Sequence, residues 1–70
     1  MNKVNHYVAW MNYKGDKVAR YQGLAETQDE FEQMCLDKGY DLSQADEIEC
    51  VKTNVTNELG RPCAKDVSEY

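Results

Sequence analysis

Apolar and polar residues alternate at the start of the chain, as they do in a strand with one buried side. Residues 4–11 read VNHYVAWM and are rich in the β-branched and aromatic types that favour strands. Residues 12–16 follow with turn chemistry around Gly15, and residues 17–22 return to a strand-like composition. The pattern therefore predicts an antiparallel β-hairpin. The two faces of its first strand carry Val4, His6, Val8 and Trp10 on one side and Asn5, Tyr7, Ala9 and Met11 on the other.

The next segment has the signals that begin and end a helix. Thr27 and Glu30 have the spacing of a capping box, in which the Thr27 hydroxyl accepts from the N–H of residue 30. The Glu30 carboxylate then accepts from the N–H of residue 27. Gly39 is the type of residue that commonly ends a helix. We therefore expect a helix over residues 28–38.

The apolar residues of this helix fall on one side of it. Phe31, Met34 and Cys35 have the i, i+3, i+4 spacing, and Leu36 lies beside them. This spacing predicts an apolar stripe that packs against one face of the hairpin, with Trp10 under the helix. The remaining side chains of the helix are polar and are expected to face water.

The last third of the chain predicts two further strands. A short turn is expected from Ser43, and residues 47–55 indicate a third strand whose apolar positions change face at Cys50 and Val51, as at a bulge. After a turn, residues 63–67 are expected to return as an edge strand. The sequence thus predicts a ββαββ order, with one antiparallel sheet and one helix across one face, an α+β fold.

Length and composition limit what such a fold can do. Seventy residues, 41% of them hydrophobic, suit a single small domain over residues 1–70 with one modest core. A chain this short leaves little room for a deep active-site cleft, and a homodimer that enlarges the core stays open. No apolar run is long enough to span a bilayer, and the N-terminus lacks a signal-peptide pattern, so a cytoplasmic location is expected.

Negative charge is concentrated in the middle of the chain. Residues 26–49 hold nine carboxylates and one cation, Lys38, while residues 1–25 have a net charge of +3 and the whole chain −5. This balance disfavours binding to phosphate backbones or anionic membranes. The run is either the solvated face of a helix or a surface that docks on a Lys/Arg-rich partner. The residues expected to form that surface are Glu26, Asp29, Glu32, Asp37, Asp41, Asp46, Glu47 and Glu49.

Aromatic residues of the hairpin offer a second candidate surface. Tyr7, Tyr13 and Tyr21 are candidate anchors in a protein interface. The alternative is a single-stranded nucleic-acid surface in which aromatic rings stack on bases and nearby cations reach phosphates, although the acidic total opposes it. The residues of that alternative are His6, Tyr7, Trp10, Tyr13 and Tyr21 with Lys14, Lys17 and Arg20. A third hypothesis is a structural subunit that associates with copies of itself.

Cysteine and histidine give no pattern for a metal, a cofactor or catalysis. Cys35, Cys50 and Cys63 contain no C-x-x-C pair, which suits a reducing compartment, and their spacing does not match a zinc site with His6. We expect Cys35 and Cys50 to be core residues. Nothing near them lowers a thiol pKa, and no carboxylate lies in an apolar stretch. The sequence therefore predicts a protein that is not an enzyme and has no metal or cofactor.

In its general make-up the chain resembles the small acidic proteins that bacteriophages and other mobile elements use against host defence, including anti-CRISPR and anti-restriction proteins. The resemblance lies in a short β-hairpin followed by an acidic helix that opens TQDEFEQM, and no diagnostic motif accompanies it. It implies a stoichiometric inhibitor in the host cytoplasm. Such an inhibitor would occupy the basic nucleic-acid-binding surface of a host protein or ribonucleoprotein complex, without touching nucleic acid itself.

Overall fold

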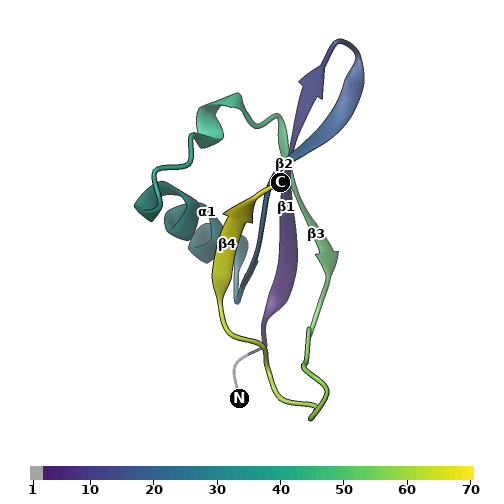
Figure 1. Ribbon diagram of the computed structural model, residues 1–70, viewed down its shortest axis with the longest axis vertical. Coiled ribbons are helices and arrows are strands. Elements are labelled where there is room, and N and C mark those ends of the chain that lie inside the picture. Colours follow the sequence, from purple (N-terminus) through teal and green to yellow (C-terminus); the bar gives the residue numbers. More distant parts are fainter. Residues whose placement is uncertain (1–2) are drawn as a thin grey trace.

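Four β-strands and one α-helix make up the computed structural model, which describes residues 3–70 (Figure 1). In chain order the elements are β1 (Asn5–Tyr13), β2 (Asp16–Ala25), α1 (Gln28–Asp37), the short 3₁₀ turn η1 (Leu42–Gln44), β3 (Glu47–Lys52) and β4 (Asp66–Glu69). The strands form one antiparallel sheet in the spatial order β3-β1-β2-β4, and α1 packs on one face of it. The predicted α+β class is confirmed, and the short turn expected from Ser43 is η1, which begins one residue earlier, at Leu42.

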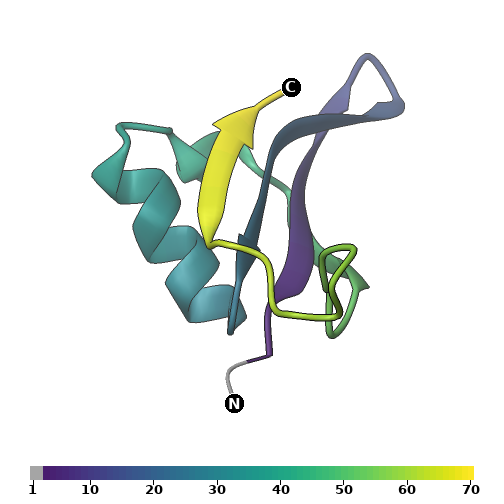
Figure 2. The ribbon, with the colours of Figure 1, turned by 60° about the horizontal axis from the view of Figure 1, so that its bottom comes forward.

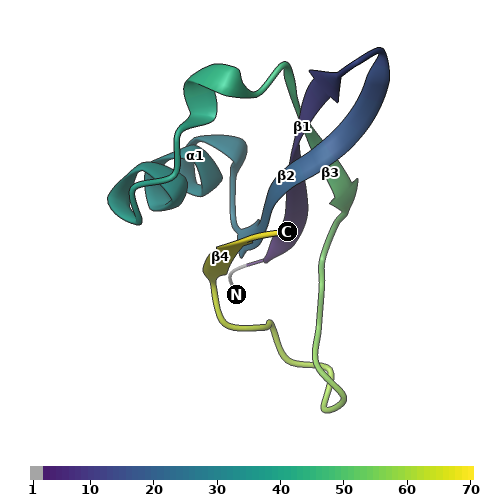
Figure 3. The same ribbon diagram turned by 45° about the horizontal axis from the view of Figure 1, so that its top comes forward.

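The β1–β2 hairpin forms the centre of the sheet, because each remaining strand adds to one of its outer edges. Its turn consists of Lys14 and Gly15, whose φ values of 53° and 85° suit the twist of the flanking strands. β3 pairs with β1, and β4 pairs with β2. Residues 53–65 consequently run from one edge of the sheet to the other, across the ends of β1 and β2 (Figure 2). The tip of the hairpin extends beyond the other elements (Figure 3).

The core lies between α1 and the sheet face that carries Tyr7 and Ala9. Phe31 and Cys35 of α1 are fully buried against this face, which confirms them as the apolar stripe of the helix. Leu36 is 57% exposed, so the stripe does not include it. The buried cluster contains Tyr7, Ala9, Tyr21, Ala25, Phe31, Cys35 and Val67, with Met34, Tyr40, Leu42, Ala45 and Ile48 packed around it.

Two residues predicted for the core lie elsewhere. Strand alternation puts Trp10 on the face opposite Tyr7 and Ala9, so the prediction that Trp10 lies under the helix is wrong. Its indole Nε1–H instead donates to Glu49 Oε1 at 3.0 Å. Cys50 is exposed, which corrects its assignment to the core, because β3 is an edge strand with only one neighbour.

The helix begins with most of the predicted cap. Thr27 Oγ1 accepts from the N–H of Glu30 at 3.1 Å, as a capping box requires. Glu30 Oε1 accepts from the N–H of Glu26 at 3.0 Å, one residue earlier than predicted. The helix ends at Asp37, and Gly39 follows with a φ of 83°, the left-handed conformation that glycine tolerates at a helix end.

The last two strands are shorter or later than predicted. β3 ends at Lys52, before its predicted end, and β4 begins at Asp66, after its predicted start. The register of β3 against β1 shifts between Cys50 and Lys52, which leaves Val51 as the extra residue of a bulge. The change of face predicted at Cys50 and Val51 is therefore present.

β4 lies very close to β2 at Gly23. A Cβ atom added to Gly23 would lie 2.4 Å from Val67 Cγ1 and 2.5 Å from the backbone oxygen of Asp66. The Val67 side chain is 1% exposed and occupies this space as part of the core. Gly23 is thus required by the close approach of the two strands.

Candidate partner-binding surface

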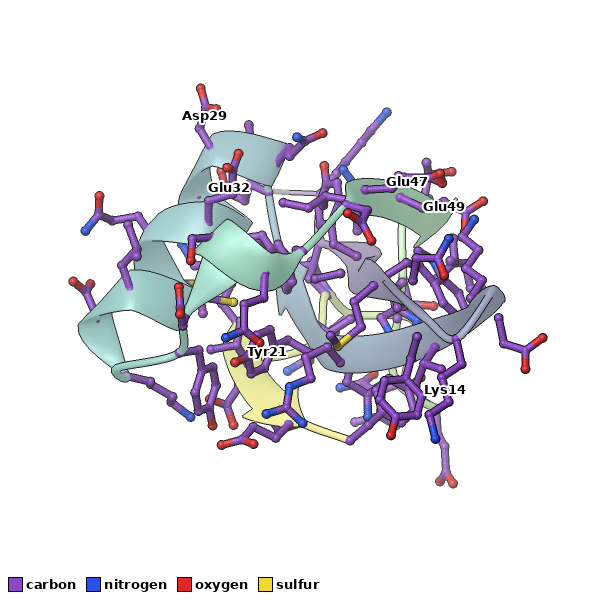
Figure 4. The ribbon with its side chains drawn as sticks, turned by 90° about the horizontal axis from the view of Figure 1, so that it is seen from above. Lys14, Tyr21, Asp29, Glu32, Glu47 and Glu49 are labelled. Atoms are coloured by element: carbon purple, nitrogen blue, oxygen red, sulfur yellow. The ribbon has the colours of Figure 1, made fainter. Side chains whose placement is uncertain are left out.

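Four of the predicted acidic residues form two pairs on two different elements, and their labels lie in the upper half of Figure 4. Asp29 and Glu32 belong to α1, whereas Glu47 and Glu49 belong to β3 and lie on the sheet face away from α1, beside Trp10. We call these four residues the acidic edge. Within the described residues 3–70, no lysine or arginine forms an ion pair with Asp29, Glu32 or Glu49.

Two lysines from outside the segment 26–49 reach its carboxylates. Lys17 Nζ lies 2.8 Å from Glu47 Oε2, and Lys65 Nζ lies 3.5 Å from Glu26 Oε1 and 3.4 Å from Glu30 Oε2. Exposed pairs of this kind contribute little stability because water screens them. The segment's own cation, Lys38, turns away to Asp66 of β4 at 2.6 Å. The carboxylates of the segment therefore greatly outnumber the lysines that neutralise them.

The other predicted acids make local contacts in separate places. Asp41 caps η1 by accepting from the N–H of Ser43 at 2.9 Å and from its hydroxyl at 2.6 Å. Asp46 accepts from the N–H of Asn12 at 2.6 Å. Asp37 accepts from the Gln33 amide at 3.1 Å, at the opposite end of α1 from the acidic edge.

Glu26 also lies outside the acidic edge, because its carboxylate faces Lys65. The sequence-based surface of eight acids is therefore divided. Four residues form the acidic edge, in which Glu47 is paired with Lys17, and the other four make local contacts in caps, turns or ion pairs.

Hydrogen bonds hold several of these groups in their charged form. The backbone N–H of Glu26 and the ammonium of Lys65 lower the pKa of the Glu30 carboxyl. The Ser43 hydroxyl and N–H lower the pKa of Asp41. Glu47 raises the pKa of Lys17, and Glu30 raises that of Lys65.

Only one of the three candidate tyrosine anchors has an exposed ring. Tyr13 at the hairpin tip is 57% exposed. Tyr7 stacks on Phe31 with ring centroids 5.7 Å apart, and Tyr21 stacks on Tyr40 at 4.9 Å, so both belong to the core. The expectation of an exposed anchor is therefore corrected for Tyr7 and Tyr21, whose strand positions face α1.

The aromatic and cationic residues of the hairpin do not form one stacking surface. Lys17 Nζ lies 5.0 Å from the Trp10 ring centroid on one face of the sheet, whereas Tyr21 is buried on the other. Glu47 and Glu49 carboxylates bond to Lys17 and to the Trp10 indole, respectively. Carboxylates beside the Trp10 ring repel the phosphates that a nucleic acid would bring.

The cysteines show no arrangement for catalysis or metal binding in the described part of the chain. Burial raises the pKa of the Cys35 thiol to about 11, with a smaller contribution from Glu32, so this thiol is protonated at neutral pH. No group of three or more His, Cys, Asp or Glu side chains within residues 3–70 is placed to hold a metal ion. No helix of residues 3–70 is long and apolar enough to cross a membrane.

Comparisons with known proteins give no relative. No protein-family model matches the chain, no similar curated protein was found, and no solved structure matches its fold. A function is therefore inferred from the residues and their geometry alone. The two counter-ions of the acidic segment, Lys17 and Lys65, carry no signal in the sequence, because the chain separates each from its carboxylate by about thirty residues or more.

Proposed function

We propose that the protein is a non-enzymatic protein-binding module that docks its acidic edge on a Lys/Arg-rich surface of a partner. The acidic edge, made up of Asp29 and Glu32 of α1 and of Glu47 and Glu49 of β3, supports this proposal. Three of these four carboxylates have no cationic partner within residues 3–70. Like charges on one surface repel each other, and a cationic partner relieves that repulsion.

The partner that fits best is a protein that normally binds nucleic acid, because such a protein presents closely spaced lysines and arginines. The acidic edge then mimics the charge of a phosphate backbone. The resemblance to phage anti-defence proteins gives the proposal its narrower form, an inhibitor of a host nucleic-acid-binding complex. Attraction between the two surfaces acts over about 10 Å at 0.1 M salt, so association should be fast and salt-sensitive.

The two alternatives from the sequence have less support. A stacking surface for single strands would need Trp10 without neighbouring carboxylates, and Glu47 and Glu49 lie beside it. Self-association has no specific contact to argue from in a single chain. Light scattering over a range of concentrations tests it directly, since a self-associating subunit gains mass as concentration rises.

A charge-matched pair of variants tests the proposal. Asp29→Asn with Glu32→Gln removes two charges from the acidic edge, while Asp16→Asn with Glu69→Gln removes two exposed charges elsewhere. Each variant and the native protein are used to capture partners from a lysate of the native host, and the affinity for each retained protein is then measured. We expect the first variant to bind at least about tenfold more weakly than the second.

Competition adds an independent check. A partner that uses its nucleic-acid site should be released by an oligonucleotide and by raising the salt concentration. Equal affinity of the two variants, or binding that neither salt nor oligonucleotide weakens, would contradict docking through the acidic edge.

A further inference from the structure

A groove of about 460 Å³ lies on the sheet face opposite α1. It crosses all four strands, because His6 pairs with both Lys52 and Leu24, and Leu24 pairs in turn with Asp66. Val55 forms one wall, and its N–H donates to the Val4 oxygen at 2.7 Å. We call this hollow the open-face groove. It lies within the volume range of about 300–1,000 Å³ that is usual for small-ligand sites.

Three groups that remain available in the open-face groove can donate hydrogen bonds. Gln22 Oε1 lies 3.2 Å from His6 Nε2, which leaves the amide NH₂ of Gln22 for a ligand. Within residues 3–70, the Lys52 ammonium and the Ser68 hydroxyl contact no hydrogen-bond partner. The groove therefore offers three different donors from three different strands.

The charge of the open-face groove differs in sign from that of the molecule. Its one carboxylate, Asp66, is bound by Lys38 Nζ at 2.6 Å and by the N–H of Val67 at 2.9 Å. Both contacts lower the pKa of Asp66 and hold it in an ion pair. Lys52 has no such partner within residues 3–70, and His6 is the other titratable group that faces the groove. A protein of net charge −5 thus carries a local positive site here.

An apolar surface lies beside these donors. Leu24 and Val55 line the groove and are only partly covered by the rest of the chain. Burial of such surface by a ligand contributes about 25 cal/mol per Å². The pairing of donors with an apolar surface favours a ligand that has an anionic end and a hydrocarbon body.

We propose that the open-face groove binds a carboxylate attached to a short apolar chain. The carboxylate pairs with Lys52 and accepts from the Gln22 amide, and the apolar chain covers Leu24 and Val55. The same chemistry belongs to a small organic acid and to the C-terminal residue of a peptide. This site lies on a different face from α1 and does not depend on the acidic edge.

Amide chemical shifts in a ¹H–¹⁵N titration test the site with defined probes. Hexanoate is compared with 1-hexanol, which has the same chain without the charge. An acetylated dipeptide ending in leucine is compared with its C-terminal amide. We expect saturable shifts at Lys52, Leu24 and Ser68 with the two acids, at about millimolar affinity, and at least about tenfold weaker binding of the neutral probes. The acid that binds more tightly identifies the source of the carboxylate.

Two substitutions of exposed lysines complete the test. Lys52→Gln removes the charge from the groove and should weaken binding of hexanoate about tenfold, whereas Lys14→Gln at the hairpin tip should leave it unchanged. Neither side chain is buried, so both variants should keep the native spectrum. The proposal is overturned if no acid gives saturable shifts, if hexanol binds as tightly as hexanoate, or if Lys52→Gln binds hexanoate as the native protein does.

Discussion

The two faces of the sheet differ in what covers them and in the side chains they carry. The face under α1 carries Tyr7, Ala9 and Val67, all buried against the helix. The opposite face carries His6 and Trp10, whose polar atoms bond to neighbouring side chains and whose rings are only partly covered. Val8 on this second face is 3% exposed, so both faces contribute to stability, but the large buried cluster lies only under α1. The difference shows how a chain of 70 residues can hold a core and still leave polar and aromatic side chains open to solvent.

Substitution of one large aromatic on each face gives the largest contrast. Phe31→Ala leaves a cavity at a fully buried position and should lower the free energy of unfolding by about 3–5 kcal/mol. A small domain has only about 5–15 kcal/mol in total, so this variant should be largely unfolded at 37 °C. Trp10→Ala should cost about 1–2 kcal/mol, because the ring is only partly covered and its hydrogen bond to Glu49 is worth about 1 kcal/mol. Urea unfolding followed by circular dichroism measures both, and equal costs would remove the distinction between the faces.

Gly23→Ala tests the packing of β4 on the buried face. The new Cβ would meet both the Val67 side chain and the backbone of Asp66, so β4 has to shift. We expect a loss of about 1–3 kcal/mol in thermal unfolding, with faster amide exchange in β4 than in β1. Ala19→Gly, at a partly exposed position of the same strand, is the control and should cost about 1 kcal/mol or less. Unchanged exchange in β4 would show that the strand accommodates the extra carbon.

Lowering the pH should reduce the free energy of unfolding, because carboxylates such as that of Glu30 lose their charge. This effect should be smaller than that of the substitutions above. The pKa of Glu30 is lowered from its ordinary value of 4.5 by the N–H of Glu26 and then by Lys65. A lowered folded-state pKa means that the stabilisation is complete above pH 4.5 and is lost as the pH falls through the folded value. Glu30→Gln should therefore flatten the dependence of the urea midpoint on pH below 4.5 and leave its slope near pH 7 unaltered. The same slope in acid for both proteins would contradict a role for this carboxylate.

Local parts of the fold could be predicted from the sequence, because their causes lie within a few residues. The hairpin turn depends on Lys14 and Gly15, and the helix start on the hydroxyl of Thr27. The side that Trp10 faces could not be predicted in this way. Alternation separates two sets of residues but does not say which set meets the helix, and the more apolar set, with Trp10, turned out to face away from it.

The candidate surfaces were predictable only in part, for a related reason. The count of carboxylates showed that an acidic surface was available. The contact between Lys65 and Glu30 could not be predicted, because the two residues are 35 positions apart and no local pattern links them. The open-face groove could not be predicted from the sequence at all. It exists because the register of four strands brings His6, Lys52 and Ser68 onto one face, and register is a property of the assembled sheet.

The return of residues 53–65 from β3 to β4 makes one edge of the sheet depend on distant parts of the chain. β4 pairs with β2 through Leu24 and Asp66, so a long loop has to close before this pairing forms. Lys38 at the end of α1 then holds the strand through Asp66 and the Val67 oxygen. The outer edge of β2 thus stays unpaired until this long-range pairing forms, and a chain without it would expose that edge to pairing with other chains.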